Sequence, residues 1–146
     1  MKHFAILLAL SLSLLSTQAH SRDTKHMLSI QEAMQNPAFQ EKLDPNVRLY
    51  FGDQKTPKIL KSLGNYSSNK KTNAFAKSDE EACEWVLLSA LLSLQERAKA
   101  EGGNAVINIA SYYKKNVYSS NTKYECHAGA IMAGVALTGT VVKVAP

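Results

Sequence analysis

The stretch from Ser78 to Gly103 most constrains what this chain can fold into. Ser78, followed three residues later by Glu81, has the pattern of a helix capping box. The Gly-Gly pair at 102–103 supplies a left-handed exit at the other end. The sequence therefore predicts one long helix that ends at Lys99 or Ala100.

The predicted helix carries an apolar surface wider than a single stripe. Its members are Ala82, Trp85, Val86, Leu88, Ala90, Leu91, Leu92 and Leu94. A helix with so broad an apolar surface must lie on a sheet, with a second partner allowed on its flank. We therefore interpret the surface as core rather than as a ligand groove, and its width permits a homodimer without requiring one.

The rest of the chain shows strand patterns and short helical pieces. Strands are expected at 47–51, 59–66, 72–76, 104–113, 122–127 and 131–144, with a polar turn at 67–71. A second capping box at Ser29–Glu32 predicts a short helix that stops at Asn36, before further helical turns over 38–43. Gly134 and Gly139 indicate bulges or close backbone approach. The order predicts an α+β fold: one long helix packed on a largely antiparallel sheet, with a short helical N-terminal lead.

The N-terminus has the pattern of a secretory signal peptide. A positive start is followed by an apolar run from Phe4 to Leu15 and by small residues that predict cleavage near Ala19. The run is shorter than the ~20 residues of a membrane span, so no transmembrane span is expected. We predict a signal peptide at 1–19, a flexible lead at 20–28 and a single α+β domain at 29–146. The mature protein is expected to be periplasmic or secreted.

The charge of the chain is mildly basic, with 17 Lys+Arg against 12 Asp+Glu. The lysines are scattered, and the pairs Lys70-Lys71 and Lys114-Lys115 lack the density of a nucleic-acid stripe. The scattered pattern is typical of a solvated basic surface, and the alternative is attraction to an anionic envelope component or an acidic envelope protein. No nucleic-acid partner is expected.

Cys83 and Cys126 are the only cysteines of the chain. An even count in an exported protein favours one disulfide between them. Reduced buried thiols, and metal ligation or redox work by Cys83, Cys126 and His127, remain open alternatives. Successive strand residues point to opposite faces, which counts against one ion held by both Cys126 and His127. Glu125 and His127 share a face and are expected to be able to pair.

An aromatic and basic cluster is the candidate binding surface. It comprises Tyr112, Tyr113, Lys114, Lys115, Tyr118 and Tyr124. Such a cluster suits an anionic glycan or a protein partner. The alternative is that the tyrosines serve cross-strand packing.

Several strings resemble a family of small exported bacterial proteins that often carries the label "excinuclease ATPase subunit". They are KKTNAF at 70–75, GNAVINI at 103–109, SYYKKN at 111–116 and ECHAGAIMAGVAL at 125–137, and the resemblance spans about residues 29–144. The chain has neither a phosphate-loop motif nor zinc-type cysteine spacing, so we do not carry over the activity in that label.

Two shorter strings resemble the YbjQ-like proteins, sometimes called heavy-metal-binding, and the RcsF-type envelope lipoproteins. These are Gly-Gly-Asn-Ala-Val at 102–106 and Gly-Thr-Val-Val at 139–142. The resemblance implies a similar α+β fold. The chain has no lipobox cysteine near Ala19, unlike the RcsF-type proteins.

Catalytic motifs are not found in the sequence. It contains no Gly-x-Ser-x-Gly elbow, no His-Glu-x-x-His helix and no Cys-x-x-Cys pair. We therefore expect a non-catalytic envelope domain that binds a protein or another envelope component, without a cofactor. One alternative is a metal-binding or thiol-redox protein that uses Cys83, Cys126 and His127. Another is a small hydrolase or transferase of unrecognised type.

Overall fold

The computed structural model describes residues 22–146, and the expected signal peptide at 1–19 lies outside the described residues. The elements, in chain order, are β1 (Thr24–Ser29), α1 (Ile30–Gln35), α2 (Pro37–Lys42), β2 (Arg48–Phe51), β3 (Ile59–Asn73), α3 (Asp79–Ala100), β4 (Ala105–Ser111), η1 (Tyr113–Lys115), β5 (Lys123–Ala128) and β6 (Met132–Val144).

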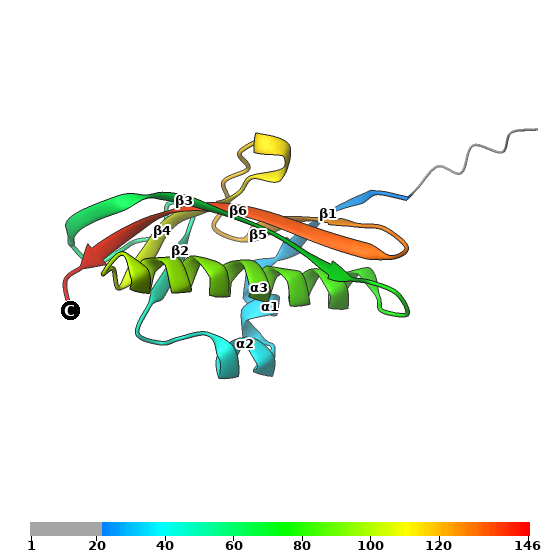
Figure 1. Ribbon diagram of the computed structural model, residues 1–146, viewed down its shortest axis with the longest axis horizontal. Helices are drawn as coiled ribbons and strands as arrows, with labels where there is room; N and C mark the ends of the chain where they lie inside the picture. Colours follow the sequence, from blue (N-terminus) through cyan, green and yellow to red (C-terminus); the bar gives the residue numbers. More distant parts are fainter. Residues whose placement is uncertain (1–21) are drawn as a thin grey trace, which may run out of the picture.

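Strand β6 is the centre of the sheet. Along one edge it pairs antiparallel with β3 from end to end, and along the other it pairs with β5 near its start and with β4 further on. Strand β1 extends the sheet beyond β5, and β2 pairs in parallel with β4. Figure 1 shows α3 lying across one face of the sheet, while the loop that contains η1 rises from the opposite face. This mixed, mostly antiparallel sheet with one long helix confirms the predicted α+β fold.

Helix α3 begins and ends where the sequence predicts. The Ser78 hydroxyl accepts a hydrogen bond from the Glu81 backbone N–H at 3.1 Å. At the other end Gly102 has φ +81°, and the Gly103 N–H donates to the Ala98 carbonyl at 2.8 Å. Both ends are therefore closed by the local chemistry of their own residues.

The helix is buried on most of its circumference, as its broad apolar surface predicts. The buried residues are Ala82, Cys83, Val86, Leu87, Leu88, Ala90, Leu91, Leu94, Gln95 and Ala98. In the predicted surface Leu92 is only partly buried. Trp85 is 41% exposed, and the Lys42 ammonium lies 4.9 Å from its ring centroid. The apolar side chains bury against the sheet and against the two short helices.

Gln95 is a buried polar residue that joins α3 to the connection between α2 and β2. Its side-chain oxygen accepts from the Asp44 N–H at 3.0 Å, and its amide donates to the carbonyls of Asp44 and Val47. These bonds satisfy an amide that would otherwise be costly to bury. Lys99 adds an ion pair to the Asp44 carboxylate at 2.6 Å, which lowers the pKa of Asp44.

The two short N-terminal helices also match their predicted boundaries. Ser29 caps α1 through the Glu32 N–H. Asn36 ends α1 and caps α2, and its side chain also donates to the Glu84 carboxylate at 2.8 Å.

Two predictions about the strands and the N-terminal segment are wrong. The polar segment 67–71 is not a turn, because β3 runs through it and pairs continuously with β6. Backbone pairing does not depend on side-chain polarity, and an edge strand accepts polar side chains on its exposed positions. Residues 24–28 are not a flexible lead, because they form most of β1, which pairs with β5.

Candidate functional site

A pocket of about 550 Å³ opens on the sheet face opposite α3. It lies between the loop that contains η1 and the hairpin that joins β5 to β6. Its lining residues are Arg22, Asp23, Lys71, Tyr113, His127, Gly129, Ala130, Ile131, Met132, Ala133 and Gly134.

The floor of the pocket is set by the strand register. His127 pairs with Gly134, and Gly134 pairs on its other side with Lys71. Side chains directly opposite each other share one face of a sheet. Gly134 has no side chain, so the space between His127 and Lys71 stays open. A Cβ at Gly134 would meet its nearest neighbour at 3.6 Å, an ordinary contact distance. The close backbone approach predicted for Gly134 is therefore wrong, and the missing side chain leaves the floor empty.

One wall of the pocket is an aromatic pair anchored by carboxylates. The Tyr113 ring stacks on the His127 ring with centroids 3.4 Å apart. His127 Nε2 lies 2.8 Å from Glu125 Oε2, and Nδ1 lies 3.2 Å from Asp23 Oδ1. A neutral imidazole has one N–H and donates to one of these carboxylates, whereas an imidazolium donates to both. The predicted pairing of Glu125 with His127 is confirmed.

Glu125 supports this wall from beneath. The residue is 8% exposed, and Lys25 Nζ lies 3.5 Å from its second carboxylate oxygen. Its backbone N–H donates to the Ser111 hydroxyl at 2.9 Å. A buried carboxylate needs such partners, so the wall is held in a defined position.

The opposite wall is apolar and unusually exposed. Ile131 is 63% exposed and Met132 is 46% exposed. Phe75, which is 71% exposed, lies on the neighbouring loop, where the Ala74 N–H donates to the Ile131 carbonyl at 2.6 Å. Large apolar side chains gathered at one place on a surface indicate a binding site.

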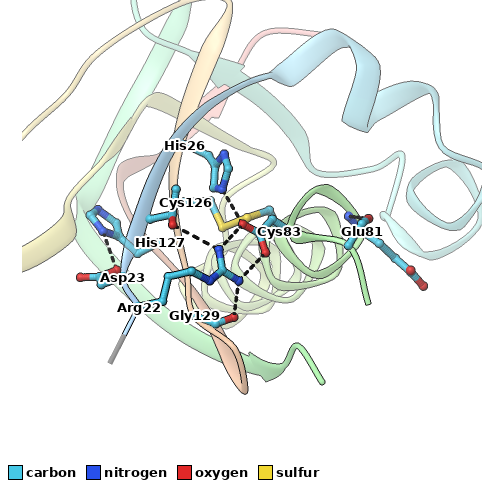
Figure 2. Close-up of polar contacts among 11 residues, drawn as sticks. Arg22, Asp23, His26, Glu81, Cys83, Cys126, His127 and Gly129 are labelled. Carbon is cyan, nitrogen blue, oxygen red and sulfur yellow. Dashed lines mark hydrogen bonds and ion pairs between the residues drawn. A yellow bond between two sulfur atoms is a disulfide. The ribbon is translucent and has the colours of Figure 1, made fainter. Parts of the chain in front are cut away.

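Arg22 closes one end of the pocket. Its guanidinium binds the Asp79 carboxylate through two hydrogen bonds of 2.7 and 2.9 Å and donates to the Gly129 carbonyl at 3.0 Å. Figure 2 shows Arg22 reaching Gly129, with His26 and the disulfide nearby. His26 Nε2 lies 2.8 Å from the same Asp79 carboxylate. Arg22, and then His26, hold the pKa of Asp79 well below its usual range.

The predicted disulfide between Cys83 and Cys126 is present. Their Cα atoms are 5.9 Å apart, and both residues are fully buried between α3 and β5. Cys126 lies on the helix side of β5, whereas His127 lines the pocket on the other side. The structure therefore does not bring the alternative metal set of Cys83, Cys126 and His127 together. Within residues 22–146, no group of three or more His, Cys, Asp and Glu side chains is arranged to hold a metal ion.

The predicted tyrosine and lysine surface divides into separate parts. Tyr113 lines the pocket, whereas Tyr118 is 38% exposed on the loop beyond η1. Tyr112 is half-buried, and Lys114 and Lys115 are exposed. Tyr124 is only 1% exposed, and burial raises the pKa of its hydroxyl. Including Tyr124 in a binding surface is therefore wrong, because its strand position faces the core beneath α3.

The sequence did not identify Lys71 and Gly134 as neighbours of His127. They come together through the pairing of β3 with β6 and of β6 with β5, which no local pattern specifies. The one available signal was a glycine inside an otherwise apolar strand, which often marks close approach of a ligand or of another backbone.

The fold and the site together define a disulfide-linked α+β domain with a pocket on the open face of its sheet. No protein-family model, curated protein sequence or solved structure matches this chain. None of the helices in residues 22–146 has the length and apolar character needed to cross a membrane.

Proposed function

We propose that this protein is an exported, non-catalytic domain that binds a component of the cell envelope in the pocket between Tyr113 and Ile131. The observation that carries the proposal is the pocket itself. It joins a carboxylate-anchored aromatic wall to an exposed apolar wall across a floor that lacks a side chain. Binding pockets commonly combine a mostly apolar lining with a few fixed polar groups.

Export is supported by two independent features. The N-terminal sequence has the pattern of a signal peptide, and the buried Cys83–Cys126 bond fits an oxidising compartment. The sequence resemblance to small exported bacterial proteins points the same way. A structural role for the disulfide is favoured over thiol exchange, because neither residue is exposed.

The proposal is tested by filling the floor of the pocket. The Gly134→Val substitution places a branched side chain between His127 and Lys71, where the structure leaves space for a Cβ. Nile red, a neutral apolar dye, is the probe, and its fluorescence is titrated against purified protein. We expect saturable binding by the wild-type protein and at least about tenfold weaker binding by the variant, because the apolar contacts are lost.

The matched control is Asn69→Val. Asn69 pairs with Ala136 on the same face of the sheet, one alternation beyond Lys71, and is not part of the pocket lining. This control should bind Nile red like the wild-type protein. The absence of saturable binding, or equal loss in both variants, would overturn the assignment of the pocket as the recognition site.

A further inference from the structure

We infer that the pocket takes an anionic amphiphile, whose carboxylate or phosphate contacts Lys71 and whose acyl chain lies along Ile131 and Met132. This inference rests on the proposed function and names the chemistry of its ligand.

Most charged side chains around the pocket already have partners within the protein. Arg22 is engaged with Asp79, and His127 lies between Glu125 and Asp23. Among residues 22–146, Lys71 makes no ion pair and no side-chain hydrogen bond, although it lines the same space. Asp23, the carboxylate of the lining, is hydrogen-bonded to His127. Within the described lining, Lys71 is therefore the charged side chain without a partner, and an anion is the group that would complete it.

The wall opposite Tyr113 and His127 offers exposed apolar side chains to a ligand. Ile131 and Met132 are exposed, and the flanking residues Ala130 and Ala133 continue the lining on either side of them. Phe75, on the adjacent loop, extends the exposed apolar surface outward. A sugar would leave these side chains in water, whereas an acyl chain would cover them.

The size of the pocket suits such a ligand. Its volume of about 550 Å³ lies within the range of about 300–1,000 Å³ that is typical of small-molecule sites. A cationic amphiphile of the same size would place its charge beside Lys71. The combination of one free cation and one exposed apolar wall therefore favours the anionic head group.

The test compares three molecules that share a twelve-carbon chain. Laurate is anionic, dodecanol is neutral and dodecyltrimethylammonium is cationic, and each is titrated below its micelle-forming concentration by native mass spectrometry. We expect laurate to bind most tightly and the cationic compound most weakly. Dodecanol that binds as tightly as laurate would overturn the inference.

A pair of lysine variants isolates the role of Lys71. Lys71→Met keeps most of the apolar stem and removes the charge, and Lys70→Met is the matched control. Lys70 pairs with the buried Val135 and is on the helix side of β3. Lys71→Met should weaken laurate binding about tenfold, in line with the loss of one charge-assisted contact, and should affect dodecanol binding much less than laurate binding. Equal effects of the two variants would overturn the inference.

Vesicles distinguish two sources of this ligand chemistry. Binding to phosphatidylglycerol vesicles, but not to phosphatidylcholine vesicles, supports a phospholipid head group as the anion. Binding to free laurate alone supports a free fatty acid. Nile red binding that is lost in Gly134→Val, without any preference for laurate, would leave the proposed function intact and overturn only the ligand chemistry. Failure of both probes would overturn both.

Discussion

The start of the described chain is held to the domain by its polar side chains. Arg22 and His26 contact Asp79 at the beginning of α3, while Asp23 contacts His127 and Lys25 contacts Glu125. Because β1 alternates between the two faces of the sheet, these contacts divide between the helix side and the pocket side. A segment whose sequence is typical of a solvated lead is therefore ordered by backbone pairing with β5, and these charge pairs add side-chain contacts on both faces.

Replacing Asp79 should make the free energy of unfolding depend less on pH in the acidic range. Arg22, and then His26, lower the pKa of Asp79, so its contribution is fully present above the ordinary aspartate pKa of about 4 and is lost progressively as pH falls toward the depressed value. We expect Asp79→Asn to lower the free energy of unfolding by about 1 kcal/mol at pH 7. Urea unfolding should show this difference shrinking between pH 4 and pH 2.

Glu80→Gln is the control for this measurement, since Glu80 lies in the same helical turn and makes none of the ion pairs found among residues 22–146. A difference between wild type and Asp79→Asn that stayed constant down to pH 2 would contradict the linkage.

At the scale of the elements, local chemistry predicted helices better than strands. Ser29, Asn36 and Ser78 specify helix starts through contacts within a few residues, so their boundaries are readable in the sequence. The full length of β3 and the existence of β1 depend on partners far along the chain. Their polar side chains give no strand pattern in the sequence, because their backbone pairing depends on partner strands that come together only in the assembled sheet.

Two glycines of β6 should differ sharply in their tolerance of alanine. A Cβ at Gly139 would lie 2.7 Å from Val106 Cγ1, and Val106 is fully buried. We expect Gly139→Ala to cost about 2 kcal/mol of unfolding free energy, because the core must shift to admit the methyl group. Gly134→Ala, with its nearest neighbour at 3.6 Å, should change stability little. Equal losses in urea unfolding would show that strand position, rather than the space around each glycine, sets the effect.

At the scale of the whole molecule, the sequence predicted the covalent link but not the pocket. The even cysteine count identified Cys83 and Cys126, and period two placed Glu125 beside His127 on one face. The pocket needs the joint register of β1, β5, β6 and β3, together with a loop that folds back to stack Tyr113 on His127. Those relations are set by the assembled sheet, so residue spacing could not reveal them.

Removing the disulfide should lower the stability of the whole domain. Cys83 and Cys126 are 43 residues apart in sequence, and their bond restricts the unfolded chain. The chain-entropy model gives about 4 kcal/mol for a loop of this length. We expect the double variant Cys83→Ala, Cys126→Ala to lose an unfolding free energy of this order in urea titrations. Wild-type protein reduced under denaturing conditions is the comparison, and stability equal to that of the oxidised protein in both cases would contradict a structural role.

Strand β5 carries the disulfide on one face of the sheet and the pocket wall on the other. Cys126 is bonded to the helix, and the next residue, His127, forms the anchored wall of the pocket. A newly made chain whose cysteines are still reduced lacks the bond that fixes β5 against α3. The disulfide and the pocket wall are therefore one residue apart on opposite faces of one strand, so the wall is built on a strand that oxidation constrains.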